Sequence, residues 1–168
     1  SDNSFSGILP MNLSSCVHMA IMRLQNNKLG RRIPAELGQK LTSMAVIGLR
    51  NNSFTGPIPV SLANMSHISY LDLTYNQLTG SIPPGLGNIQ NMQYFSIFGN
   101  ILSGMLPPSL YNWSSIEVFS VGFNMLYGSI PGDIGSMFPK LQHFALTRNH
   151  FMGTIPSSIS NISSLEVL

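Results

Sequence analysis

The sequence predicts an α/β-type repeat solenoid, mostly strand and irregular structure, with a parallel sheet along its inner side. Two observations predict this fold. Apolar residues recur at fixed places around seven asparagines spaced 24, 25, 24, 24, 24 and 25 residues apart, and a proline follows each asparagine by seven positions. A period of this length is typical of repeat architectures, whose units pack mainly against their neighbours. The asparagines are Asn3, Asn27, Asn52, Asn76, Asn100, Asn124 and Asn149.

A strand is expected just before each asparagine. Apolar and polar residues alternate there, as in Leu71-Asp72-Leu73-Thr74, and this period of two indicates a strand with one buried face. No single repeat can bury its apolar side alone. The strands of successive repeats should therefore pair in parallel over one continuous core.

A bend and an irregular return should follow each strand, because the spacing becomes irregular and carries Gly and Pro. The asparagine amide can bond backbone groups that the bend leaves unpaired, and stacked copies would form a ladder. Glycine stands four positions after six of the seven asparagines, where we expect positive φ; Arg31 replaces it in one repeat.

The return contains an apolar column that holds Cys16, Leu41, Met65 and Trp113 among others. We therefore expect Cys16 to be a buried structural thiol, with a nucleophile or disulfide partner as the alternative. Trp113 is assigned to the core for the same reason. The two 25-residue spacings come from one-residue insertions just before Leu41 and Phe138.

The whole chain is interpreted as one array. It consists of a partial repeat over 1–16, full repeats over about 17–41, 42–65, 66–89, 90–113, 114–138 and 139–162, and a partial repeat over 163–168.

The repeat LxxLxLxxNxLxGxIP, clearest over residues 68–83, resembles the plant-specific leucine-rich repeat. Residues 155–165 are similar to segments of plant leucine-rich-repeat receptor kinase ectodomains. The resemblance implies a right-handed superhelix with a second short strand after each bend, and short 3-10 or irregular convex returns. It also implies caps with paired cysteines, which this chain lacks. We therefore expect an internal fragment of a longer ectodomain with an apolar cross-section open at each end.

Composition excludes several classes of function. Only 8% of residues are charged and the net charge is +2, so the clustered Lys and Arg of nucleic-acid binding are missing. No apolar run is long enough to span a membrane. The histidines, His18, His67, His143 and His150, are too scattered for a zinc site. We expect no metal, no cofactor and no catalytic set in this segment.

Five N-x-S sequons predict a secreted glycoprotein; the alternative is that Asn-Ser merely suits the turns. Three of them share one column of the convex return. The acceptors are Asn12, Asn51, Asn64, Asn112 and Asn161.

Variable side chains of the inner face are the candidate ligand contacts. Exposed aromatic side chains on a rigid sheet are typical binding anchors, although sheets favour aromatic residues in any case. The candidates are Tyr70, Asp72, Tyr75, Tyr94, Phe98, Phe123, Arg23 and Arg50. Some receptors of the family hold a peptide carboxylate with two arginines of one repeat. Here Arg23 and Arg50 come from two repeats, so the aromatic group is expected to be the main contact.

The resemblance implies a recognition module from the extracellular domain of a plant receptor kinase. It would lie at the apoplastic face of the plasma membrane, as part of a single-pass protein. Its partners would be a peptide or protein ligand and a co-receptor ectodomain. The alternatives are a secreted inhibitor of microbial cell-wall hydrolases and a receptor-like protein without a kinase.

Overall fold

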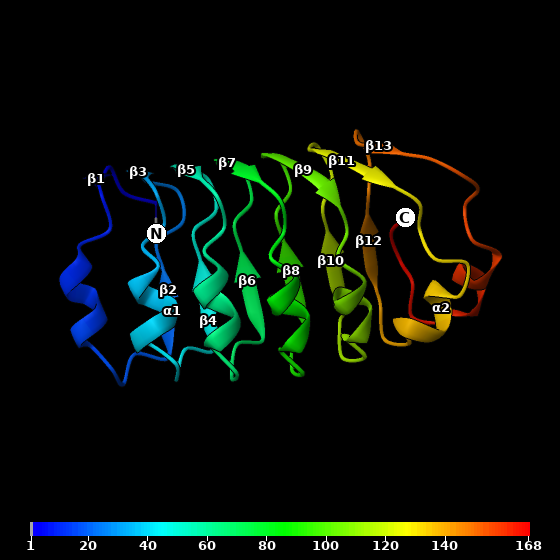
Figure 1. The fold of residues 1–168 in the computed structure, drawn as a ribbon, viewed down its shortest axis with the longest axis horizontal. Helices are drawn as coiled ribbons and strands as arrows, with labels where there is room; N and C mark the ends of the chain where they lie inside the picture. The colour runs from blue at the N-terminus through cyan, green and yellow to red at the C-terminus, as the bar shows by residue number, and fades with distance from the viewer. Residues whose placement is uncertain (1) are drawn as a thin grey trace.

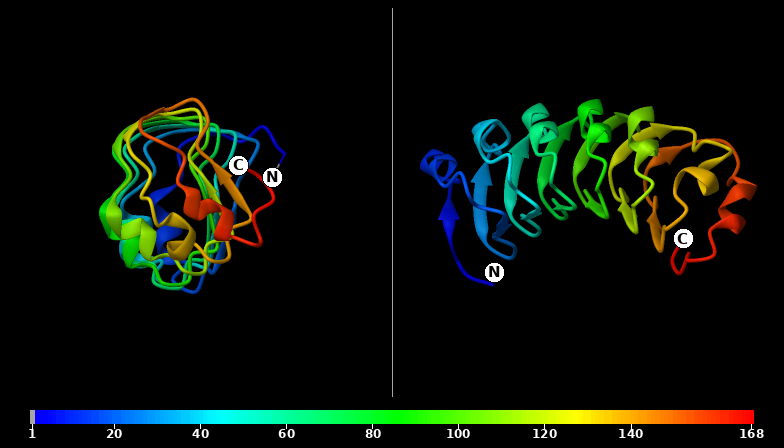
Figure 2. Two further views of the ribbon diagram at one scale, coloured as in Figure 1. Left: turned by 90° about the vertical axis from the view of Figure 1, so that its right-hand side faces the viewer. Right: turned by 90° about the horizontal axis from the view of Figure 1, so that it is seen from below.

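The chain forms a single row of stacked coils. A computed structural model describes residues 2–168, and the coils follow one another from the N- to the C-terminus (Figure 1). Seen along the row they nearly superimpose, and seen from below they form an arch with the helical turns on its outer, convex side (Figure 2). The predicted solenoid class is confirmed.

Six parallel strands form the inner sheet on the concave side. They are in register: Leu71, five residues before a ladder asparagine, pairs with Ile47 and Phe95 at the same place in neighbouring repeats. Consecutive repeats are therefore neighbours in the sheet. The strands are β2 (Ile21–Arg23), β4 (Val46–Gly48), β6 (Tyr70–Asp72), β8 (Tyr94–Ser96), β10 (Val118–Ser120) and β12 (His143–Ala145).

A second parallel sheet of seven short strands runs along the edge where the chain has turned past the asparagine. The resemblance implied these strands. They are β1 (Ser6–Gly7), β3 (Lys28–Arg31), β5 (Ser53–Gly56), β7 (Gln77–Gly80), β9 (Ile101–Met105), β11 (Met125–Gly128) and β13 (His150–Phe151).

The convex returns are helical turns of two kinds. In the 24-residue repeats the turn closes with a bond three residues back, as from Met65 N–H to Leu62 O. In the two longer repeats Leu41 and Phe138 donate four residues back, to Leu37 and Ile134. Widening a 3-10 turn to an α turn thus absorbs the inserted residue. The segments are η1 (Met11–Ser15), α1 (Glu36–Lys40), η2 (Val60–Asn64), η3 (Pro84–Asn88), η4 (Pro108–Asn112), α2 (Ile134–Met137) and η5 (Ser157–Asn161).

One continuous core runs between the sheets and the returns. Leu71, Phe95 and Phe119 of the inner strands are fully buried, as is Trp113 of the return column. The Trp113 indole N–H donates to Leu86 O at 3.2 Å, so its polar edge is paired. The assignment of Trp113 to the core is confirmed.

The expectation that Cys16 is buried is wrong. Its thiol is free and exposed, whereas Leu41 and Met65 of the same column are 0% exposed. Each of those two is covered by a return on either side. The turn η1 that ends beside Cys16 contacts only α1 among the described segments, so its outer side is open.

The asparagine ladder has the same hydrogen bonds in repeat after repeat. Asn76 Oδ1 accepts from Phe54 N–H at 3.0 Å. Its Nδ2 donates to Leu49 O and Leu73 O, each at 3.1 Å, and to Thr74 O at 3.2 Å. A single amide therefore pairs backbone groups of its own coil and of the coil before it. Equivalent bonds are made by Asn27, Asn52, Asn100, Asn124 and Asn149; at Asn3 the backbone N–H donates to Asn26 O at 3.1 Å.

Two columns of the bend have left-handed backbone. The glycines four residues after the asparagines have positive φ, as does Arg31 in their place with φ 61°. The residue just before each asparagine also has positive φ, including Tyr75 at 50° and Phe123 at 53°. The sequence does not predict positive φ in this second column, because bulky residues such as Tyr and Phe rarely adopt that conformation.

Candidate functional site

The candidate residues of the inner face fall into two groups. Tyr70, Asp72 and Tyr94 lie within the strands β6 and β8. Tyr75, Phe98 and Phe123 follow the strands, at the rim where the chain bends towards the second sheet. The structure therefore separates what the sequence presents as one aromatic group.

The strand group is a packed pair of tyrosines above a carboxylate. The rings of Tyr70 and Tyr94 stack with centroids 4.2 Å apart and planes 14° apart. The Tyr70 hydroxyl donates to Asp72 Oδ2 at 3.4 Å, and Asp72 Oδ1 accepts from Thr74 N–H at 3.0 Å. Asp72 is only 5% exposed. It therefore supports the tyrosines from beneath, rather than presenting its carboxylate to a ligand.

Burial keeps both phenols of this group neutral. It raises the pKa of Tyr70 well above its usual value, with the Asp72 carboxylate and Tyr94 adding to the rise. Burial also raises the pKa of Tyr94, again helped by Asp72. The pair consequently offers an apolar stacked surface and neutral hydroxyls to anything that lies on the sheet.

The rim group is more exposed and forms a row. The Tyr75 ring meets Phe98 edge-on at 5.7 Å, and Phe98 lies 4.9 Å from Phe123 between centroids. Tyr75 is 49% exposed and Phe123 is 43% exposed. Rigid, half-exposed aromatic rings of this kind are suited to anchoring a ligand at small entropic cost.

The two predicted arginines do not form a pair within one repeat. Arg23 ends β2, and Arg50 lies two residues beyond the end of β4. Both are exposed. Gly48 and Gln25 lie beside them, and Gln25 Oε1 is buried without a hydrogen-bond partner among the described atoms. Of these two arginines, Arg50 is the one that meets the aromatic group, with Cζ 5.8 Å from the centroid of Tyr75.

All five sequon asparagines are exposed. Asn64, Asn112 and Asn161 each end a helical turn on the convex side, and the middle residues of their sequons, Met65, Trp113 and Ile162, are core. Asn12 also lies in a convex turn, near the start of η1 rather than at its end. Asn51 differs, because it lies in the bend with positive φ and its Nδ2 donates to Asn26 Oδ1 at 3.0 Å.

The described part of the chain contains no group of three or more His, Cys, Asp or Glu that could hold a metal ion. His143 Nε2 lies 3.7 Å from Glu166 Oε2 at the C-terminal end of the inner sheet. His150 lies on β13 of the second sheet, and His18 and His67 are exposed. Of the helices formed by residues 2–168, none has the length and apolar character to cross a bilayer.

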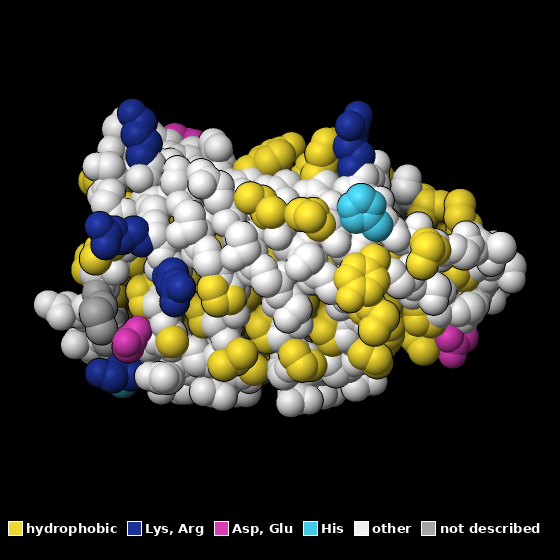
Figure 3. All heavy atoms as spheres, turned by 45° about the horizontal axis from the view of Figure 1, so that its top comes forward, with side chains coloured by type: hydrophobic (Ala, Val, Ile, Leu, Met, Phe, Trp, Pro, Cys, Tyr) yellow, Lys and Arg dark blue, Asp and Glu magenta, His cyan; other side chains and the backbone are white. Residues whose placement is uncertain are grey.

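Hydrophobic side chains also gather on the second sheet, a surface on which none of the predicted contacts lies. Figure 3 shows them along the middle and C-terminal part of that face. Met105 is 63% exposed, Tyr127 49% and Met152 72%. A groove of about 750 Å³ lies beside Met105 and Tyr127, and reaches Asn112 of the return.

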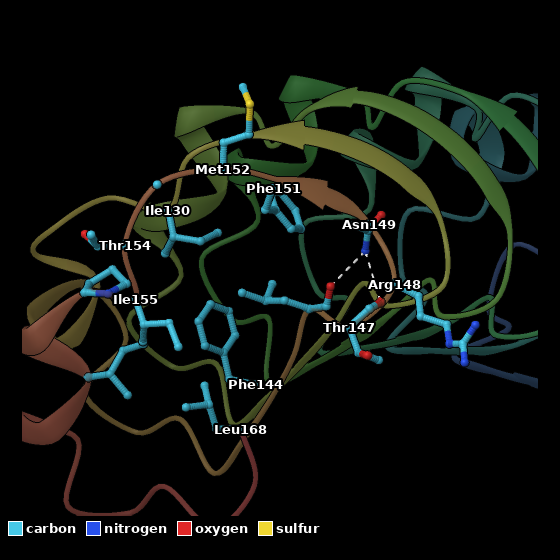
Figure 4. A pocket seen from close by; sticks show the side chains of 14 residues that line it. Ile130, Phe144, Thr147, Arg148, Asn149, Phe151, Met152, Thr154, Ile155 and Leu168 are labelled. Atoms are coloured by element: carbon cyan, nitrogen blue, oxygen red, sulfur yellow. Dashed lines mark hydrogen bonds between the residues drawn. The ribbon is translucent and has the colours of Figure 1, made fainter.

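At the C-terminal end of the row, an apolar cavity of about 510 Å³ lies between β12, β13 and η5. Phe144, Phe151 and Ile155 point towards it in Figure 4, and Asn149 donates to backbone carbonyls at its edge. Ile155 is 76% exposed, although its column is core in the middle repeats.

Comparisons with known proteins identify the repeat. The Leucine Rich Repeat family matches residues 43–65, 67–89 and 140–162. Receptor-like protein 6 of Arabidopsis thaliana is 34% identical over 67 residues, which are 40% of this chain and 7% of that protein.

Solved plant receptor ectodomains have the same fold. The receptor kinase HAESA of Arabidopsis, in complex with the peptide hormone IDA and the co-receptor SERK1, is 33% identical with a TM-score of 0.92; the match covers 98% of this chain and 27% of that one. The leucine-rich-repeat ectodomain of the membrane receptor kinase GASSHO1/SCHENGEN3 from Arabidopsis thaliana, in complex with CASPARIAN STRIP INTEGRITY FACTOR 2, is 28% identical with a TM-score of 0.91. That match covers 99% of this chain and 20% of that ectodomain.

Proposed function

Because the chain is a leucine-rich-repeat array with the fold of plant receptor kinase ectodomains, we propose that it is a ligand-recognition module that binds a peptide or protein on its concave face. The observation that carries the proposal is the aromatic surface on that face. Tyr70 and Tyr94 stack within the sheet, and Tyr75, Phe98 and Phe123 line its rim.

The module would do no chemistry of its own. The parent protein would be a single-pass receptor at the plasma membrane, with this segment at the apoplastic side and a Ser/Thr kinase inside the cell. The solved relatives support the proposal, since HAESA is in complex with a peptide hormone and a co-receptor. By analogy, a bound ligand would bring in a co-receptor ectodomain and so activate the kinase.

A receptor-like protein without a kinase is the second candidate. It is favoured by the similarity to Receptor-like protein 6, at 34% identity over 67 residues. The recognition surface is the same in both cases, so the coding sequence downstream of the array would decide between them.

Replacing Tyr70, Tyr94 and Phe98 together with alanine in the complete ectodomain tests the site. Peptides from the cell-wall fluid would be captured on the wild-type protein and identified by mass spectrometry. Calorimetry would then compare the dissociation constants of the two proteins. Central aromatic anchors are each worth about 2 kcal/mol or more, so we expect at least about 30-fold weaker binding.

A matched triple variant, Val60→Ala with Met105→Ala and Tyr127→Ala, removes exposed side chains of similar kind away from the concave face. It should bind as the wild type does. Equal binding by the concave-face variant, with its fold intact by circular dichroism, would refute the proposed site.

A further inference from the structure

Five side chains from five successive repeats form an unbroken row along the rim. Arg50 lies over Tyr75 at 5.8 Å, Tyr75 meets Phe98 at 5.7 Å, and Phe98 meets Phe123 at 4.9 Å. Arg148 closes the row, with Cζ 5.1 Å from the centroid of Phe123. The row is therefore apolar in the middle and cationic at both ends.

Two glycines make room for this row. A Cβ on Gly99 would lie 2.5 Å from the Tyr75 ring, and a Cβ on Gly122 would lie 2.8 Å from the Phe98 ring. Each of these rings therefore lies directly over the backbone of the next repeat. Larger residues at either position would displace the rings, so the row requires a glycine beneath Tyr75 and another beneath Phe98.

Strained backbone also places two of the rings. Tyr75 and Phe123 have φ of 50° and 53°, a conformation that costs bulky residues of order 1–3 kcal/mol. Asparagine or glycine fills this place in other repeats, as Asn51 and Gly99 do. Strain that the surrounding fold enforces is often found at functional sites.

The charges at the two ends are unpaired. Within residues 2–168, neither Arg50 nor Arg148 makes an ion pair or a side-chain hydrogen bond, and both are exposed. Asp72, the one carboxylate among the variable inner-face positions of the five repeats in the row, is 5% exposed. Exposed carboxylates lie beyond the two ends of the row, at Asp2 and Glu166. The row itself therefore attracts anionic groups.

We propose that the ligand of this face is an extended acidic peptide, with an apolar segment on the three rings and a carboxylate side chain towards each arginine. The inference rests on the function proposed above and specifies its ligand. The four steps of the row, 5.8, 5.7, 4.9 and 5.1 Å, place the two guanidinium groups no more than about 22 Å apart. An extended chain advances about 3.3–3.6 Å per residue, so the two acidic residues should be about five or six positions apart.

Selection from a random library of displayed 12-residue peptides tests the inference. The complete ectodomain would be the target at low salt. We expect the selected peptides to share two Asp or Glu residues about five or six positions apart, with apolar residues between them. A synthetic consensus peptide would then be titrated calorimetrically against the wild type and against Arg50→Gln and Arg148→Gln.

Each arginine variant should weaken binding of the consensus peptide by about two- to fivefold, as for an exposed ion pair. Changing the matching acidic residue of the peptide to its amide should have no further effect in that variant. Lys40→Gln is the control, because Lys40 is an exposed cation in the convex turn α1, away from the row, and it should leave the affinity unchanged.

The possible failures are distinct. A consensus sequence without paired acidic residues would overturn the acidic-peptide inference while leaving a peptide site intact. So would a consensus peptide that binds both arginine variants as tightly as it binds the wild type. Unchanged affinity for the Tyr70, Tyr94 and Phe98 triple variant would refute the proposed site itself. If no peptide is selected and polygalacturonate binds in an Arg50-dependent way, the row recognises an acidic polysaccharide and both proposals are wrong.

Discussion

Replacing Asn76 with alanine should show what one ladder asparagine contributes to stability. Asn76 is 9% exposed and makes four side-chain hydrogen bonds. They are not equally important. Leu49 O also accepts from Asn52 Nδ2, and Leu73 O also accepts from Asn100 Nδ2. Each of these carbonyls therefore keeps a partner in the variant.

The N–H of Phe54 is different, because Asn76 Oδ1 is its partner and Phe54 is 0% exposed. A buried donor left unpaired costs about 1–3 kcal/mol, and each lost bond to a carbonyl adds a smaller amount. We expect Asn76→Ala to lower the free energy of unfolding by about 2–4 kcal/mol. Urea unfolding followed by circular dichroism would measure the change, provided that the slope m stays constant.

Asn27→Ala is the matched control. Asn27 Oδ1 accepts from Phe5 N–H at 3.1 Å, but Phe5 is 61% exposed, so water can replace the lost acceptor. Its loss should cost about 1 kcal/mol or less. Equal costs for Asn27→Ala and Asn76→Ala would refute the idea that the buried N–H dominates.

Asn76→Asp distinguishes the hydrogen bond that the side chain accepts from those that it donates. The carboxylate can still accept from Phe54 N–H, but its second oxygen would face the carbonyl oxygens of Leu49, Leu73 and Thr74 at about the present 3.1–3.2 Å. The change should destabilise the fold at least as much as alanine does. A stable aspartate variant would mean that the donated bonds contribute nothing.

Three further predictions concern other parts of the fold. Gly87→Ala should destabilise it by several times the loss from Gly132→Ala in thermal melts, because the new Cβ would lie 2.3 Å from the Ser109 carbonyl, whereas Gly132 has open space; equal melting temperatures would contradict this. Stability should fall as pH rises from 10 towards about 12: burial raises the pKa of Tyr111 to about 12 from 10.0, so over that range the folded state holds a proton that the unfolded state releases. Absorbance titration of phenolate against Tyr111→Phe would check it, and an ordinary titration near 10 would count against it. Cys16 should react with a thiol reagent in the native protein as fast as in urea, since it is exposed; protection of the thiol would show that something covers η1.

The sequence predicts well whatever all repeats share. The asparagine spacing gives the coil, the apolar columns give the core, and both are correct because every middle repeat meets the same neighbours on both sides. Cys16 shows where this fails. Its column predicts burial, but burial depends on a covering return on each side, and η1 contacts only α1. An apolar column predicts burial only for repeats that have a neighbour on each side, so the prediction does not apply at the ends of the row.

The candidate site was predicted less completely, because it depends on differences between repeats. The sequence finds the aromatic residues of the inner face but not their division into a strand pair and a rim row. It also presents Asp72 as a ligand contact, whereas the structure buries that carboxylate under Tyr70. Those outcomes follow from contacts between side chains of neighbouring repeats. Aligning the repeats shows which residues are equivalent, but it does not show which residues of neighbouring repeats touch.

Arg148 shows how such information could be recovered. It was not among the predicted contacts, because it comes from the seventh repeat, two repeats beyond Phe98, and nothing in its own repeat marks it. The pairs that matter run diagonally, from Tyr75 to Gly99 and from Phe98 to Gly122. A large residue beside a glycine in the following repeat predicts a side chain laid across the rim. The rule selects Tyr75 and Phe98, whereas Phe123 and the guanidinium of Arg148 join the row through ring contacts that only the structure shows. The proposed recognition surface of this chain therefore depends on contacts between neighbouring repeats, whereas the fold depends on the pattern that each repeat shares.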